Sequence, residues 1–168
     1  MKTFALSVLA SIAFVSQAAM AQSMNSEDRT FVNKVAQAGS SEIATGKIAV
    51  AQSTRSDVRN FAQQMVDDHS KAGEELGAIA RKKSMAPPTM ADGAHQKLAH
   101  KLEKLHGRKF DRMYLDDAGV QDHKEAVALF ESEVKNGSDP DVRGFAEKTL
   151  PTIKHHYEMA QQLAANYK

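Results

Sequence analysis

The chain has 168 residues, of which 22 are basic and 21 acidic, a formal net charge of +1 at pH 7, and no cysteine. The balanced charge offers no strongly basic surface, so neither nucleic acid nor an anionic membrane surface is an expected partner. The absence of cysteine excludes disulfides, thiolate metal ligands, a cysteine nucleophile and a lipid-modified cysteine.

Residues 1–21 have the pattern of a secretory signal peptide. Lys2 precedes a run of apolar residues, and the run is followed by the tripeptide Ala-Met-Ala at 19–21, which is an A-x-A cleavage pattern. The run is shorter than the roughly 20 residues that cross a bilayer as a helix, and nothing later in the chain is hydrophobic enough to span one. We therefore predict an exported protein, periplasmic or secreted, with one domain at residues 22–168.

Two long helices are predicted in the first half of the chain. The first covers about residues 27–52 and contains Gly39 and Gly46, which would let another backbone approach closely. The second covers residues 57–83. Because only a few residues connect them, the two helices must run antiparallel as neighbours.

The apolar face of the second helix is interrupted near its middle. Apolar residues recur at the three-and-four spacing of a helix face, but His69 stands where the face requires its next apolar residue, directly after two acidic residues. The start of this helix returns near the C-terminus and gives the chain the look of two related halves. Asp57-Val58-Arg59 and Phe61-Ala62 recur as Asp141-Val142-Arg143 and Phe145-Ala146.

The second half predicts two more long helices after an irregular connection. Residues 84–93, with two consecutive prolines, cannot continue a helix; a short helix at 95–106 follows and ends at Gly107 as its C-cap. The third long helix covers 109–135, and the fourth begins at Pro140. No strand-like alternation appears. The predicted fold is all-α, a ferritin-like four-helix bundle with a long crossover between helices 2 and 3 that contains a short extra helix.

Four polar side chains lie on the apolar faces of the four long helices, each near its helix midpoint: Glu42, His69, His123 and His156. In the third helix the predicted inward residues are Phe110, Met113, Val120, Val127, Phe130 and Val134, and His123 falls on the same face. Midpoints of antiparallel helices of similar length share one layer. We therefore expect these four groups to converge on the bundle axis.

Convergent histidines and carboxylates in a bundle core are typical of metal sites. The i, i+3 Glu-x-x-His pairs of two-metal bundles are missing, however, so a mononuclear site fits better than an oxidase or peroxidase centre. Glu42 and the three histidines are the predicted ligands, and the neighbouring Asp68 and Asp122 would either ligate or orient the histidines. Such ligands suit zinc, copper, nickel or iron, and the sequence does not choose among them.

The same residues have a second interpretation. Buried polar groups can simply hydrogen-bond to one another, in which case the protein would be a metal-free helical structural or interaction protein of the periplasm without catalytic activity. The sequence contains no G-x-S-x-G, phosphate-binding loop, H-E-x-x-H or dinucleotide fingerprint, so no enzyme class is indicated. It also does not identify a protein partner or an oligomeric state.

Several short motifs together resemble the bacterial domain-of-unknown-function family numbered 4142, which is placed with ferritin-like proteins. The resemblance rests on Phe31-Val32 before Glu42, Phe61-Ala62-x-x-Met65-Val66-x-Asp68-His69, Phe110-Asp111-x-x-Tyr114, Asp122-His123, and Leu150-Pro151 with His156. It covers nearly all of residues 22–168. The resemblance implies an exported four-helix bundle, and it implies no activity.

Overall fold

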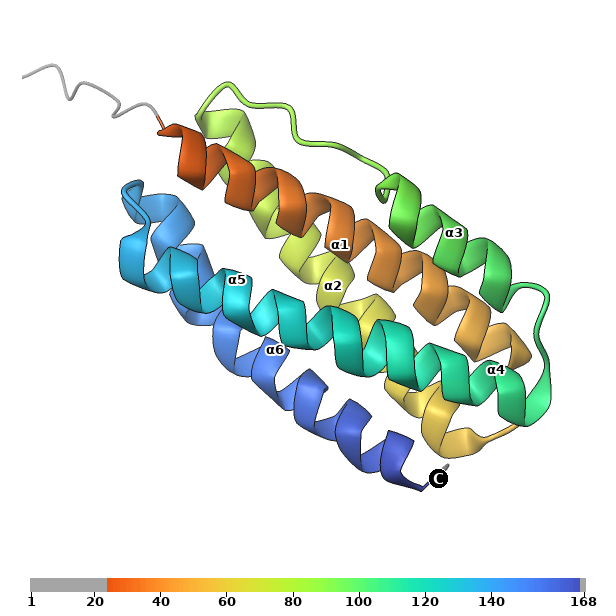
Figure 1. Ribbon diagram of the computed structural model, residues 1–168. Helices are drawn as coiled ribbons and strands as arrows, with labels where there is room; N and C mark the ends of the chain where they lie inside the picture. The colour runs from red at the N-terminus through yellow and green to blue at the C-terminus, as the bar shows by residue number, and fades with distance from the viewer. Residues whose placement is uncertain (1–23, 167–168) are drawn as a thin grey trace, which may run out of the picture.

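The structure is a computed structural model that describes residues 24–166 (Figure 1), so the predicted signal peptide lies outside the described residues. The all-α prediction is confirmed, because the described residues form helices and no strand. The helices are α1 Ser26–Gln52, α2 Ser56–Lys82, α3 Gly93–Leu102, α4 Gly107–Met113, the π-helix η1 Tyr114–Asp122, α5 His123–Asn136 and α6 Pro140–Ala165.

The helices form a bundle of four long rods (Figure 1). Three rods are α1, α2 and α6, and the fourth is made of α4, η1 and α5, which follow one another without a break. α1 packs most extensively against α2, and α5 against α6. The shorter α3 lies on the outside of the bundle and contacts α1.

The prediction for the short extra helix was wrong at its C-terminal end. α3 ends at Leu102, four residues earlier than expected, and Gly107 begins α4 instead of ending α3. Gly107 has a φ of +57°, a conformation that favours glycine. The glycine therefore turns the chain into the third rod, which starts two residues before the predicted boundary.

Both tight turns of the bundle are closed by the same hydrogen bond, which supports the two related halves seen in the sequence. The guanidinium Nη1 of Arg59 donates to the carbonyl of Ser53 at 3.0 Å, just beyond the end of α1. Nη1 of Arg143 donates to the carbonyl of Gly137 at 3.3 Å, just beyond the end of α5. Each arginine lies near the start of one helix and gives a hydrogen-bond partner to a carbonyl at the end of the preceding helix.

A buried carboxylate that no sequence motif singles out links three helix ends. Asp28 in α1 is fully buried and accepts hydrogen bonds from the backbone amides of Ser138 (3.0 Å) and Asp139 (3.1 Å). Asp139 in turn caps α6 and pairs with Nζ of Lys83 at 2.8 Å, directly after α2. These bonds fix the ends of α1, α2 and α6 relative to one another, and with them the levels of their side chains.

The third rod buries the predicted face and, at the π-helix, additional residues. Phe110 and Phe130 are buried, and the other predicted inward residues, Met113, Val120, Val127 and Val134, are partly buried and pack against the core. Tyr114, Leu115 and Ala118, which were not among the predicted inward residues, are fully buried. They lie in η1, where hydrogen bonds join residues five apart instead of four, so the α-helical spacing on which the prediction was based does not apply there.

A polar layer divides the core into two apolar clusters. One cluster contains Phe61, Met65 and Tyr114, and the other contains Phe31, Leu76 and Phe130. Along every rod the predicted site residue lies between them: His69, for example, comes after Met65 and before Leu76. Among residues 24–166 no helix is long and apolar enough to cross a bilayer.

The close approach predicted for the two glycines of α1 exists at one of them. A Cβ added to Gly46 would lie 2.9 Å from Cγ2 of Val66 and 3.1 Å from the carbonyl oxygen of Ala62, both in α2. A Cβ added to Gly39 would meet no atom within 4 Å, so that half of the prediction was wrong. At Gly46, therefore, α1 and α2 approach each other too closely for a side chain.

We expect Gly46→Ala to lower the free energy of unfolding by about 1–3 kcal/mol, because the added methyl group forces α1 and α2 apart. Gly144→Ala is the matched control: it lies in α6 with no atom within 4 Å of an added Cβ, so it should gain up to about 1 kcal/mol from helix propensity. Urea unfolding followed by circular dichroism measures both. A Gly46→Ala chain as stable as the Gly144→Ala chain would contradict the tight packing.

Candidate metal centre

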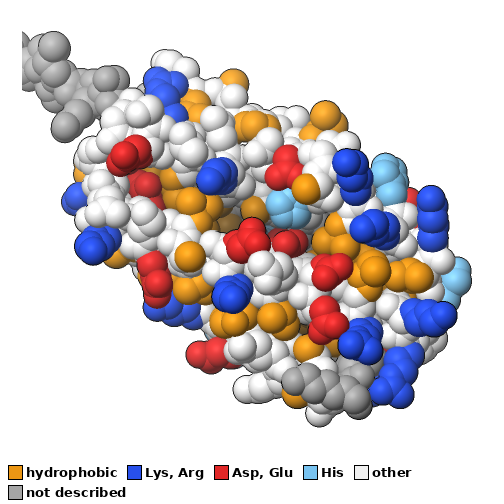
Figure 2. Space-filling view, in the orientation of Figure 1, with side chains coloured by type: hydrophobic (Ala, Val, Ile, Leu, Met, Phe, Trp, Pro, Cys, Tyr) orange, Lys and Arg blue, Asp and Glu red, His pale blue; other side chains and the backbone are white. Residues whose placement is uncertain are grey.

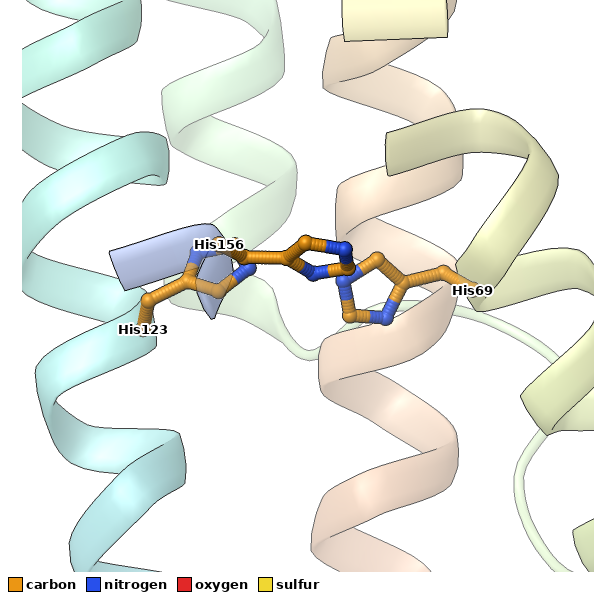
Figure 3. Close-up of side chains that lie close together, drawn as sticks. All are labelled: His69, His123 and His156. Atoms are coloured by element: carbon orange, nitrogen blue, oxygen red, sulfur yellow. The ribbon is translucent and has the colours of Figure 1, made fainter. Parts of the chain in front are cut away.

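Three histidines from three rods meet in the middle of the bundle (Figure 3). His69 lies in α2, His123 is the first residue of α5, and His156 lies in α6. The centroids of their rings are 5.6 Å (His69 to His123), 5.6 Å (His69 to His156) and 5.4 Å (His123 to His156) apart. The convergence that the helix midpoints predicted is therefore present for all three rings.

The three rings have the spacing of a loose metal-ligand set. One nitrogen from each ring can be chosen so that all three lie within 4.8 Å of one another. Tetrahedral coordination at metal–nitrogen distances of 2.0–2.1 Å separates the ligand nitrogens by about 3.4 Å. Each nitrogen would have to move less than about 1 Å towards the common centre to bind an ion.

Backbone and side-chain acceptors fix the hydrogens of two rings. Nδ1 of His123 lies 3.1 Å from the carbonyl oxygen of Ala118, in the π-helix, and must donate to it. Nε2 of His156 lies 2.9 Å from Oδ2 of Asp68 and donates to that carboxylate. The remaining nitrogens, Nε2 of His123 and Nδ1 of His156, then carry free lone pairs.

One nitrogen in each of the three rings is buried without a protein partner in the described part of the chain. Nε2 of His69, Nε2 of His123 and Nδ1 of His156 have no hydrogen-bond partner among residues 24–166 and are shielded from solvent. Buried polar atoms in folded proteins are nearly always paired. One such atom in each of three adjacent rings therefore needs an explanation.

The carboxylates predicted with the histidines lie at different distances from them. Asp68 contacts His156 directly, as described above, and so takes the orienting position. Glu42 is buried beside His123, with Oε1 3.7 Å from Nδ1, but it is outside the group of three converging nitrogens. Asp122 faces His95 of α3 instead, at 3.7 Å from Nε2.

Comparison with protein families decides where the chain belongs. Residues 13–163 match the family model described as Domain of unknown function (DUF4142). The chain belongs to the DUF4142 family. None of the curated proteins compared with it is similar enough in sequence to count as a match.

Two solved structures share the fold of this DUF4142 chain. A DUF305 fragment from Deinococcus radiodurans has a TM-score of 0.75 at 14% sequence identity, over 86% of this chain and 99% of that one. A DUF305 protein from Streptomyces coelicolor, provisionally described as secreted, has a TM-score of 0.71 at 15% identity, over 84% of this chain and 92% of that one. At these identities the likeness establishes a shared helical-bundle fold and no more.

Burial keeps all three imidazoles of the DUF4142 chain neutral near pH 7. Desolvation lowers the pKa of His69 well below its usual value, and the neighbouring rings lower it further. Burial lowers the pKa of His123 to about 4. It also lowers the pKa of His156, although Asp68 opposes that shift. Neutral imidazole is the form that binds a metal ion.

The acidic neighbours are shifted the other way. Burial raises the pKa of Glu42 well above its usual value, and Asp122 adds to the effect. Burial also raises the pKa of Asp122 to about 6 and that of the Tyr114 hydroxyl well above its usual range. The surroundings of the rings therefore disfavour charge of either sign when no ion is bound.

Two features of the site escaped the sequence analysis. The first feature is the π-helix, which supplies the carbonyl that orients His123. The sequence near this carbonyl offers one sign of close packing, Gly119. A Cβ added to Gly119 would lie 3.0 Å from Cβ of Ala160, so the glycine allows α6 to approach. The second feature is a cavity lined by His69, the crossover and residues of α1 and α5. Its walls come from segments far apart in the chain, so no local pattern predicts it.

The pKa of His123 makes a prediction for the metal-free DUF4142 protein. Because the pKa of His123 is lower in the folded chain than in the unfolded chain, where it is about 6.5, protonation of His123 favours unfolding. The contribution of this residue to the free energy of unfolding is therefore full above about pH 6.5 and is lost as the pH falls towards 4. Relative to His123→Gln, the wild type should lose about 3 kcal/mol of unfolding free energy between pH 7 and pH 4. Urea unfolding in the presence of a chelator measures this difference.

Glu42→Gln provides the contrast with the opposite sign. Because burial raises the pKa of Glu42, the contribution of this residue to the free energy of unfolding is full below about pH 4.5 and is lost as the pH rises. The Glu42→Gln chain should therefore gain stability over the wild type with increasing pH. A constant difference from pH 4 to pH 8 for both variants would show that neither side chain is held in its neutral form.

Proposed function

We propose that this protein binds one transition-metal ion in the bundle core through His69, His123 and His156, and that it does so outside the cytoplasm after removal of residues 1–21. The observation that carries the proposal is the set of three buried nitrogens, one from each ring, without a partner among the described residues. The single-domain assignment to residues 22–168 belongs to the same proposal.

A metal ion can compensate this arrangement in all three rings at once. Each buried polar atom without a partner costs about 1–3 kcal/mol. A water molecule donates to at most two ring nitrogens, so it matches all three only when His69 carries its hydrogen on Nε2 and donates to the water oxygen. With the hydrogen of His69 on Nδ1, a metal ion accepts all three lone pairs, and coordination then offsets the cost of burying them.

The donor set favours borderline metals. Three neutral imidazoles suit zinc, copper and iron, whereas calcium and magnesium require oxygen ligands. The carbonyl of Ala118 and the carboxylate of Asp68 each accept the other N–H of a ring, the arrangement that orients metal-binding histidines in proteins. Three protein ligands leave one tetrahedral position free.

The physiological role that fits best is metal handling or stress protection in the cell envelope. The signal-peptide pattern of residues 1–21 supports export, and the fold relative from Streptomyces coelicolor is itself described, provisionally, as secreted. Metal binding is sufficient for this role, and the proposal includes no catalysed reaction.

Metal analysis tests the proposal directly. Protein purified from the periplasm, or loaded with zinc, copper or iron, should hold about one ion per chain, and the ion should raise the melting temperature. The double variant His69→Ala, His156→Ala should lose it, while the exposed pair His100→Ala, His106→Ala should retain it. A wild type that is empty and refuses all three metals would favour a metal-free structural or interaction protein.

The orienting role of Asp68 makes a separate prediction. Asp68→Asn should weaken metal binding by about 10–100-fold without unfolding the protein, because an amide holds the Nε2–H of His156 less firmly than a carboxylate does. Asp67→Asn is the matched control, since Asp67 is exposed and contacts Gln63 instead. Competition with a chromophoric chelator measures both affinities, and equal affinities would rule out the orienting role.

A further inference from the structure

A cavity of about 760 Å³ lies one helical turn from the histidine layer. Each rod contributes a small or apolar lining residue three positions from its site residue: Gly39 from α1, Ala72 from α2, Ala126 from the third rod and Ile153 from α6. All four residues lie on the same side of the histidine layer. In α1 and α6 the lining residue comes three positions before the site residue, and in α2 and the third rod, which run in the opposite direction, it comes three positions after it. His69 is the residue of the histidine layer that lines the cavity.

His69 connects the cavity to the other two rings. It lines the cavity, its Nε2 has no partner among the described residues, and its ring lies 5.6 Å from those of His123 and His156. A metal ion held by the three rings would therefore have its free coordination position on the cavity side. The opposite side is filled by buried Met65, Gly119 and Ala160.

The walls of the cavity are mainly apolar. Leu76, Phe130 and Ile153 come from the bundle, and Met85 and Pro87 come from the crossover, which covers the cavity from outside. On the face in Figure 2, hydrophobic side chains are exposed between α1 and α5, and acidic side chains gather near the middle of that seam. The charged residues of the lining are of both signs and include Asp92 and Asp122, which flank His95, and the basic residues Lys34 and Arg81.

We propose that the cavity binds a neutral, mainly apolar organic molecule with one nitrogen donor, and that this nitrogen takes the free position of the metal ion. The inference rests on the proposed function. The volume lies in the range of small-molecule sites, and the apolar walls make a charged body costly to bury. Neutral nitrogen is a donor that borderline metals prefer.

The test uses the full chain loaded with cobalt(II), whose visible absorption reports coordination, and two probes that share a nitrogen donor. Imidazole has no apolar body, whereas 4-phenylimidazole adds a phenyl ring. Burial of that ring should make 4-phenylimidazole bind at least about tenfold more tightly than imidazole. Phenylacetate, which carries the same ring on a carboxylate, should bind more weakly than 4-phenylimidazole.

Gly39→Leu places the extra side chain in the cavity. Gly39 lines the cavity and an added Cβ would meet no atom within 4 Å, so the leucine fills space without displacing a neighbour. It should reduce the advantage of 4-phenylimidazole to less than about threefold and leave cobalt binding unchanged. Gly144→Leu is the matched control, since Gly144 is equally open but exposed on α6, and it should preserve the full advantage.

The outcomes separate this inference from the metal site itself. If cobalt is bound and lost with His69→Ala, His156→Ala, but both azoles bind equally, or phenylacetate binds best, or Gly39→Leu has no effect, the cavity ligand is refuted and the metal site stands. If the wild type takes up no cobalt, zinc, copper or iron, the proposed function and the cavity ligand fail together.

Discussion

The structure depends on the burial of polar rings in the middle of an apolar core: His123 and His156 are fully buried, and His69 is partly buried. The rings stay neutral because burial disfavours their charged forms, and two of them have a fixed hydrogen because Ala118 and Asp68 accept it. A polar layer at this depth would weaken a bundle whose core were otherwise continuous. The tight helix packing at Gly46 and the buried network around Asp28 hold the rods together on either side of it.

Much of the fold was predictable because it follows from local periodicity. Long stretches with one apolar face give the four rods, and the two short turns fix their antiparallel pairing. The depth argument also worked for His69, His123 and His156, because the residues after His123 lie in regular α-helix, where the three-and-four spacing holds. Before His123 the same rule missed the buried Tyr114, Leu115 and Ala118, since these residues lie in the π-helix and the rotation per residue differs there.

The surroundings of the histidines could not be predicted in the same way, because they depend on contacts between distant segments. Glu42 satisfied the spacing argument, and Asp122 was named as the acidic neighbour of His123. Asp122 nevertheless faces His95 of α3, and Glu42 lies beside His123, outside the converging nitrogens. Asp68 was expected to support the site and does contact His156, but which neighbouring acid reaches a ring depends on helix rotation by a few tens of degrees. That quantity is set by packing, as at Gly119 against Ala160, and not by the sequence of one helix.

The cavity lies on one side of the histidine layer, while buried Met65, Gly119 and Ala160 pack on the other side. The crossover residues Met85 and Pro87 line this cavity. A species that exchanges at the rings from the cavity side therefore passes the crossover, and its residence time would depend on the movement of that segment as well as on the strength of its coordination.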